Sequence, residues 1–156
     1  MDFAASMVIF STALLVVFFA WSYATQQNQQ QLSYNIMENA ATSASDSLVR
    51  HPGLPEDWNE TTVLSIGLAA SENVINESKA ESFLKIDDYT IKKLLGIGNY
   101  DFYFEIRYDN GSLAFTPSGQ ALQKGMYPTT ASVIIPAERH VIYMDRIANM
   151  MLLVWS

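Results

Sequence analysis

The sequence predicts an α+β protein, in which a long N-terminal helix precedes a small domain of short helices and an antiparallel β-sheet of about four strands. Residues 1–50 contain no proline or glycine, and both follow directly at Pro52-Gly53. Apolar and polar side chains alternate over residues 100–108 (YDFYFEIRY), and the turn-forming Asp109-Asn110-Gly111 comes next. We therefore expect an apolar-to-amphipathic helix over residues 1–50 and a globular domain over residues 51–156.

Residues 3–24 form a long apolar run (FAASMVIFSTALLVVFFAWSYA) without charge, proline or glycine. At about 1.5 Å per residue, a helix of this length measures roughly 33 Å and crosses a hydrocarbon core of about 30 Å. Trp21 and Tyr23 close the run, and such amphipathic aromatic side chains favour the boundary between lipid and water. The run predicts a helix of membrane-spanning length.

The absence of charge continues beyond this run, because no Asp, Glu, Lys or Arg occurs between Asp2 and Glu38. A helix over this neutral stretch would measure roughly 52 Å, well beyond a hydrocarbon core. The segment Gln26–Gln31 (QQNQQQ) is polar yet uncharged, which suits a place where helices of several subunits crowd together and a buried charge would be costly. The alternative is a polar spacer beside the membrane.

Two patterns indicate that this helix packs against others. Small residues lie near one face and would let neighbouring helices approach closely, although Ala and Ser are common in any membrane helix. The second part of the helix has an apolar residue at every fourth position, namely Leu32, Ile36, Ala40, Ala44 and Leu48. This stripe can rest on a globular domain or on neighbouring helices. The residues that we expect to pack in an assembly are Phe3, Ser6, Ala13, Ala20, Ala24, Gln29, Leu32 and Ile36.

The N-terminus allows three interpretations. A removable secretory signal could end at Ser22-Tyr23-Ala24, but such a signal needs a basic start and a shorter apolar region. A signal anchor should carry Lys or Arg beside the helix, and none occurs before Arg50. We favour the third interpretation, in which a basic leader has been removed ahead of the apolar helix.

Short elements are expected after the break at Pro52–Pro55. Thr62–Leu68 predicts a strand, and Ser71 is expected to cap a helix that carries Val74, Ile75, Ala80, Phe83 and Leu84. Asp87 and Asp88 should open a second short helix, and Gly96 should end it.

The last part of the chain predicts antiparallel strands. Residues 100–108 should place Phe104 and its alternate neighbours on a packed face and Glu105 on a solvated one. Leu113–Thr116 should pair back across the hairpin, and a loop should follow to Pro128. Further strand-like segments are Ala131–Ile135, Arg139–Tyr143 and Met150–Trp155, with a helix over Asp145–Met151 as the competing prediction.

Composition excludes several kinds of chemistry. The chain of 156 residues has no cysteine, so disulfides, thiolate metal sites and thiol catalysis are excluded. Its net charge of −7 opposes binding to nucleic acids. His51 and His140 are isolated in the sequence and lack the spacing of metal ligands. We expect no enzymatic activity, no metal and no cofactor.

Three Asn-x-Ser/Thr sequences follow the helix and match the acceptor for N-glycosylation, at Asn59, Asn76 and Asn110. An exterior location of the domain would explain them. Chance matches are common in a chain rich in Asn and Ser, and Asn110 also has a structural role in its turn.

The opening MDFAASMVIF resembles the mature start of archaeal type IV pilins and pilin-like proteins, and the resemblance extends over the first 50 residues. Pro52-Gly53-Leu54-Pro55 through Trp58 and the ending Leu152–Trp155 are also similar to elements of that family. The resemblance implies a prepilin peptidase, which removes a leader, and an assembly ATPase with its platform as partners. Many bacterial pilins carry Glu where this chain has Ala5; Asp2 is expected to be exposed or to cap the helix, with a comparable electrostatic role as the alternative.

These observations predict a structural subunit of an extracellular filament at the cell surface. Copies of the chain would be stored in the membrane and would then assemble through their N-terminal helices. The alternatives are a single-span, membrane-anchored surface protein and a minor, adhesive or priming pilin whose outer domain binds a partner.

Overall fold

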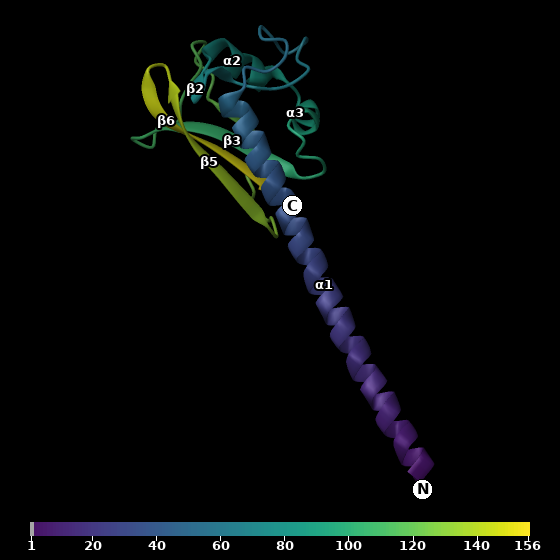
Figure 1. Cartoon of the computed structure of the whole chain (residues 1–156). Coiled ribbons are helices and arrows are strands. Elements are labelled where there is room, and N and C mark those ends of the chain that lie inside the picture. The colour runs from purple at the N-terminus through teal and green to yellow at the C-terminus, as the bar shows by residue number, and fades with distance from the viewer. Residues whose placement is uncertain (1) are drawn as a thin grey trace. The chain divides into compact units, whose positions relative to one another are not determined.

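The computed structural model describes residues 2–156, with all side chains except those of residues 2 and 27–30. The chain forms two compact units, unit 1 (Met1–Ile36) and unit 2 (Met37–Ser156). The α+β class is confirmed. The elements follow in the order α1 (Asp2–Arg50), β1 (Ala69–Ser71), β2 (Val74–Ile75), α2 (Glu77–Lys85), α3 (Asp88–Leu94), β3 (Asp101–Tyr108), β4 (Gln123–Gly125), β5 (Ile134–Tyr143) and β6 (Arg146–Trp155) (Figure 1).

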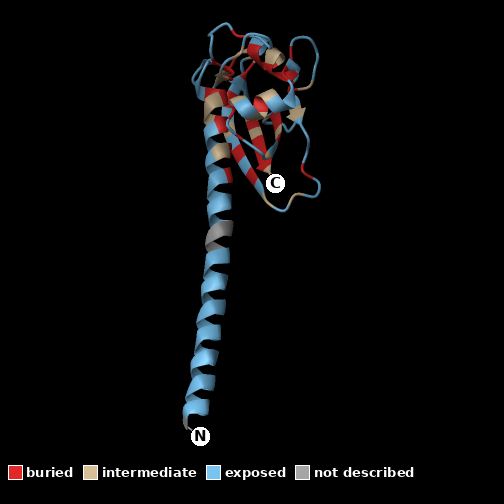
Figure 2. Ribbon diagram, turned by 90° about the vertical axis from the view of Figure 1, so that its right-hand side faces the viewer, coloured by how far each residue is buried: buried red, intermediate tan, exposed pale blue. Residues whose placement is uncertain are grey.

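Helix α1 runs to Arg50, as the absence of proline and glycine predicts, and belongs to both units. In unit 1, every described side chain from residue 3 to residue 36 is exposed (Figure 2). Within the described chain, α1 is the one helix that is long and apolar enough to span a membrane, and its most apolar window has a mean hydropathy of 2.4.

Residues 37–50 of α1 are part of the core of unit 2. Met37, Ala41, Ala44 and Leu48 are buried, a spacing of four, three and four residues that keeps them on one face of a helix with 3.6 residues per turn. The sequence predicts a boundary after residue 50, whereas the two units divide between Ile36 and Met37. The end of a helix is therefore not the end of a packing unit.

Unit 2 contains a six-stranded sheet in the order β1-β2-β5-β6-β3-β4. Three long antiparallel strands, β5, β6 and β3, form its centre. Strand β4 pairs antiparallel with β3 at one edge of the sheet. At the other edge, the β1-β2 hairpin joins β5 through a parallel pairing of Val74 with Ile142. The sequence predicts about four antiparallel strands; the additional strands have two or three residues each, which is too short for an alternating pattern to reveal them.

One face of this sheet packs under helices. Phe102, Phe104 and Ile106 of β3 are buried, and the ring of Phe83 in α2 meets that of Phe104 edge to face at 5.0 Å between centroids. On the same face, Arg139 of β5 bonds Asp46 in the last turns of α1, with 2.9 Å between Nε and Oδ1. Helices α1 and α2 therefore cover the same side of the sheet.

The predicted strand over Thr62–Leu68 is wrong, because this segment bonds to α1 and to a loop instead of to another strand. Leu68 donates its main-chain N–H to the carbonyl of Leu48, and Ser47 donates its hydroxyl to Ile66. Asn73 similarly bonds Val49. Carbonyls in the last turn of a helix lack partners within the helix, and here residues that follow supply them.

Both short helices begin at a residue whose side chain accepts a main-chain hydrogen bond from three positions later, and only one of these caps is the predicted one. Helix α3 follows its predicted cap Asp87, and Gly96, with a φ of 69°, follows its end as predicted. The predicted Ser71 cap is wrong, because Ser71 ends β1 and Val74 and Ile75 form β2. Asn76 caps α2, since its side chain accepts a hydrogen bond from the main chain of Lys79.

The predicted turn at Asp109-Asn110-Gly111 is confirmed, with the N–H of Gly111 bonded to the carbonyl of Tyr108 at 2.8 Å. Leu113–Thr116 does not form a full strand, because Leu113 makes only an isolated bridge and β4 pairs with β3 instead. The predicted loop from Thr116 to Pro128 therefore contains a strand.

The competing helix over Asp145–Met151 is wrong. Met144 and Asp145 have φ angles of 49° and 58°, as in a two-residue hairpin turn, and β6 begins at Arg146. Strand β5 is continuous through Pro136, whereas the sequence predicts two separate strand segments there, Ala131–Ile135 and Arg139–Tyr143. Proline fits because the partner of Pro136 is β6, while β2 joins β5 only at Ile142.

Candidate functional site

The first candidate surface is the apolar part of unit 1. The bulky side chains of residues 3–24 are more than half exposed, from 54% for Leu14 to 84% for Phe3. Soluble proteins rarely expose a contiguous apolar surface of this extent without a membrane or protein partner. This surface is therefore the first candidate for contact with a membrane or another protein.

The polar groups within this surface are compatible with an apolar partner. Thr12 donates its hydroxyl to the carbonyl of Val8 at 2.8 Å, and Thr25 donates to Trp21 at 2.9 Å. Each bond joins residues four positions apart within α1, so neither hydroxyl needs water. Both can leave water without losing a hydrogen bond.

The assembly residues predicted from the sequence lie on α1, and none of the described ones is buried. Exposed are Phe3, Ser6, Ala13, Ala20, Ala24, Leu32 and Ile36. The side chains of Asp2 and Gln29 lie outside the described residues. In the predicted stripe at every fourth position, Ala44 and Leu48 are buried, whereas Leu32 and Ile36 are exposed. A step of four residues drifts round a helix, and the buried face instead begins at Met37.

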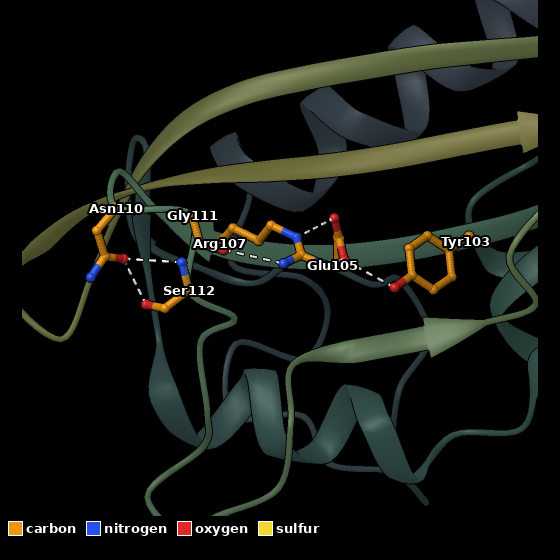
Figure 3. A network of polar contacts seen from close by, with 6 residues as sticks. All are labelled: Tyr103, Glu105, Arg107, Asn110, Gly111 and Ser112. Carbon is orange, nitrogen blue, oxygen red and sulfur yellow. Dashed lines mark hydrogen bonds and ion pairs between the residues drawn. The ribbon is translucent and has the colours of Figure 1, made fainter.

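The second candidate feature is a polar network on the opposite face of the sheet from α1 and α2. Glu105 is only 4% exposed, although alternation places it on the solvated face. Arg107 holds both of its oxygens, with Nε 2.7 Å from Oε1 and Nη2 2.9 Å from Oε2. Tyr103 donates its hydroxyl to Oε2 at 2.9 Å (Figure 3). A bidentate partner and a phenol offset the desolvation of the buried carboxylate.

The network changes the ionisation of two of its members. Burial, and then the hydrogen bond to Glu105, raise the pKa of Tyr103 to about 12. The hydrogen bond from Arg107 to Glu105 raises the pKa of the guanidinium. Tyr103 and Arg107 therefore both keep their protons at neutral pH, which suits a structural role rather than proton transfer.

Arg107 also connects this network to the hairpin. Its Nη1 donates to the carbonyl of Gly111 at 3.2 Å, and the N–H of Tyr108 donates to the carbonyl of Ser112 at 2.9 Å. Asn110 lies exposed in the turn between Tyr108 and Ser112. The turn is thus held by a strand residue whose own position is set by the buried Glu105.

The three predicted glycosylation acceptors occupy different environments. Asn59 and Asn110 are exposed in turns, whereas Asn76 is half-buried and caps α2. Asn76 also lines a cleft of about 440 Å³ beside Trp58 and Lys79. Each acceptor belongs to a separate segment: Asn59 to the loop after α1, Asn76 to the cap of α2 and Asn110 to the turn after β3.

Lys79 in this cleft is a buried cation with a structural contact. Its Nζ donates to the carbonyl of Pro52 at 2.7 Å, and Trp58 donates its indole N–H to the same carbonyl at 2.9 Å. Burial lowers the pKa of Lys79, while the nearby carboxylates Glu56 and Asp57 oppose that shift. These bonds tie the segment after α1 to α2.

Sequence reasoning missed Lys79 and the role of Glu105. The pair Glu105 and Arg107 had a detectable signal, because opposite charges two positions apart on a strand share a face. Lys79 had none, since its partners are carbonyls distant in sequence. Among the described residues, no group of three or more His, Asp or Glu could hold a metal ion.

The chain matches no protein-family model, no curated protein and no solved structure.

Proposed function

We propose that this chain is a structural subunit of an extracellular filament of the type IV pilus kind, assembled through its N-terminal helices. The observation that carries the proposal is the position in α1 of the first charged residue after Asp2. Residues 3–36 of unit 1 are uncharged, and the first charged residue, Glu38, directly follows Met37, the first residue of unit 2. The neutral stretch therefore extends over unit 1 from residue 3 to its last residue, Ile36.

A membrane alone does not require such a stretch. Residues 3–24 already give roughly 33 Å of helix, enough for a hydrocarbon core of about 30 Å. The uncharged residues from 25 to 36 add roughly 18 Å, for which a lone anchor has no need. Helices crowded into a filament core do need it, because an unpaired charge among them would cost several kcal/mol.

Assembly would exchange one apolar environment for another. In the bilayer, residues 3–24 would contact lipid, and in the filament they would contact the same helix of other subunits. Burial is then roughly conserved, and the main chain and the hydroxyls of Thr12 and Thr25 remain bonded within α1 throughout. Unit 2 would form the outer surface, on which its excess of acidic residues meets water.

A single-span surface protein is the second candidate, favoured by the length of the apolar run and by Trp21 and Tyr23 at its end. The two candidates differ in what surrounds residues 25–36. In a filament these residues pack among helices; beside a membrane they are solvated. A charge introduced there separates the two.

The test is Gln29→Glu in cells that make the protein, with the sheared extracellular fraction examined by electron microscopy and its subunits identified by mass spectrometry. We expect filaments from the wild type and at least a tenfold loss from Gln29→Glu, because the new charge would be buried. Gln29→Asn keeps the position neutral, and Gln120→Glu places the same charge on an exposed residue of unit 2. Both control variants should assemble normally.

Normal filament yield from Gln29→Glu would contradict the packing of this stretch. Recovery of the wild-type chain only as a membrane-bound monomer would contradict the filament itself and favour the single-span protein.

A further inference from the structure

Two of the three Asn-x-Ser/Thr sequences adopt the same local geometry. In each, the side-chain oxygen of Asn accepts bonds from the main-chain N–H and the hydroxyl of the residue two positions later. Asn110 Oδ1 lies 3.0 Å from Ser112 N and 2.7 Å from Ser112 Oγ. Asn59 Oδ1 lies 2.9 Å from Thr61 N and 2.7 Å from Thr61 Oγ1.

This geometry fixes which way the amide nitrogen points. A main-chain N–H can only donate, so the atom facing it must be the oxygen, and Nδ2 is directed elsewhere. Figure 3 shows the nitrogen of Asn110 turned away from Ser112 and Arg107. Asn59 and Asn110 are both exposed, and no acceptor in the described chain bonds either Nδ2. Each nitrogen is therefore open to a reagent from solvent.

The turn at Asn110 is held on a rigid base. Gly111 has a φ of 79°, a conformation that glycine adopts without strain, and its carbonyl is bonded by Arg107. Arg107 is in turn fixed by the buried carboxylate of Glu105. The acceptor is thus presented in one conformation, and a sugar on Nδ2 would leave every bond to Oδ1 intact.

Asn76 has the same sequence pattern but a different environment. It is half-buried, its Oδ1 accepts from Lys79 N at 3.1 Å, and its own N–H donates to Leu68 at 2.7 Å. The other two residues of the pattern, Glu77 and Ser78, form the first turn of α2. A transferase could bind this segment only by unwinding the helix and removing its cap.

We propose that Asn110 and Asn59 carry N-linked glycans and that Asn76 does not. The donor is a lipid-linked sugar phosphate, used by a transferase outside the cytoplasm. Nδ2 forms a bond to the anomeric carbon, the bond from that carbon to the phosphate oxygen breaks, and the lipid phosphate leaves with the electron pair. A base of the transferase takes one proton from Nδ2. The proposal rests on the exterior placement of unit 2, which the proposed function shares.

The test is glycopeptide mass spectrometry of the full chain purified from cells that produce it, together with Asn110→Asp, Asn59→Asp and Asn76→Asp. Aspartate keeps the accepting oxygen of each turn or cap but has no amide nitrogen. Asn110→Asp and Asn59→Asp should each lose one glycan mass, and Asn76→Asp should lose none. A glycan on Asn76, or unmodified peptides at both Asn110 and Asn59, would overturn the proposal.

A matched pair tests the hydroxyl at the first acceptor. Ser112→Thr keeps the hydroxyl and should keep the glycan on Asn110, whereas Ser112→Ala removes it and should lose that glycan. Retention of the glycan in Ser112→Ala would contradict the assignment.

Labelling of the chain separates this proposal from the filament proposal. The protein has no cysteine, so Thr129→Cys introduces a single thiol at an exposed position of unit 2. A membrane-impermeant maleimide should label it on intact cells. Labelling without glycans overturns the glycan proposal alone, and glycans without filaments overturn the filament proposal alone. A thiol that cannot be labelled overturns the exterior placement, and with it both proposals.

Discussion

The two parts of α1 differ in composition and have opposite environments. Residues 3–36 expose every described side chain, including Phe10, Phe18 and Trp21. Residues 37–49 bury Met37 and Leu48, together with small residues such as Ala41 and Ala44, in the core of unit 2. One continuous helix thus contains a part that packs within the chain and a part that is exposed.

The comparison teaches that helical structure and burial are separate properties of this sequence. Helix formation follows from the absence of proline and glycine and applies to both parts alike. Burial follows from the buried face of residues 37–49, which keeps the helical period and meets a sheet, whereas residues 3–24 are apolar on all sides. A helix that is apolar all round is suited to a membrane or to the interior of an assembly.

The same substitution in the two parts should have opposite effects. Ala44 is 1% exposed, and Ala44→Asp would bury a charge without a partner at a cost of several kcal/mol, a large share of the roughly 5–15 kcal/mol that stabilises a domain. We expect unit 2 to lose its near-ultraviolet circular dichroism in detergent. Ala13 is exposed, and Ala13→Asp should leave the free energy of unfolding of unit 2 within about 0.5 kcal/mol of the wild type.

Ala13→Asp should instead weaken membrane insertion, by about 3 kcal/mol for an acidic residue near the centre of a span. The measurement is the fraction of chain that resists alkaline extraction from membranes. If both variants unfold unit 2, or if neither changes membrane extraction, the distinction between the two parts of α1 is wrong.

The sequence predicts the long elements of the fold because their signals are local. The length of α1, the alternation in β3 and the turn at Asp109-Asn110-Gly111 each depend on neighbouring residues alone. The segment Thr62–Leu68 has strand-like composition but bonds to the end of α1, a partner that no local pattern reveals. Ser and Asn are equally good cap residues. Ser71 belongs to the β1-β2 hairpin, so the next suitable residue, Asn76, caps α2.

The candidate site is predicted in the same uneven way. The apolar run of α1 and the three Asn-x-Ser/Thr patterns can be recognised from the sequence alone. The difference between Asn76 and Asn110 is not, because it depends on which residue starts α2 and on how Arg107 holds Gly111. Burial of Glu105 is likewise a property of the sheet, since alternation alone places that residue in solvent.

Alkaline pH should affect the two parts of α1 differently, without any mutation. Burial raises the pKa of Tyr143 in unit 2 to about 12, whereas an unfolded chain ionises tyrosine near 10. In the folded state, the Tyr143 hydroxyl therefore keeps its proton to a higher pH than in the unfolded chain. The stability that this provides is complete below about pH 10 and is lost as the pH rises towards 12. A shift of this size corresponds to about 2–3 kcal/mol. Unit 2 should therefore unfold at a lower urea concentration at high pH, while residues 3–36 keep their helical signal.

Tyr143→Phe tests this cause. The variant loses one hydrogen bond to the carbonyl of Phe115, about 1 kcal/mol, but it should flatten the fall in stability between pH 10 and 12. Tyr103 has a pKa raised to about 12 as well, so a residual fall should remain and should disappear when Tyr103→Phe is added. Urea unfolding in detergent at pH 9 and pH 11.5 provides the measurement, and an equal fall in wild type and double variant would contradict the assignment.

The smallest expected effect concerns the ion pair that joins the last turns of α1 to the sheet. Asp46 Oδ1 lies 2.9 Å from Arg139 Nε and 3.9 Å from Arg50 Nε, and all three side chains are partly exposed. Asp46→Asn should therefore lower the free energy of unfolding of unit 2 by only about 1 kcal/mol, and less in high salt because mobile ions screen the pair. Glu38→Gln removes a charge from an exposed position of the same helix and should change stability by less than about 0.5 kcal/mol. Urea unfolding at low and high salt compares the two. An equal, salt-independent loss in both variants would mean that general charge on α1, and not the contact with Arg139, fixes its last turns to the sheet.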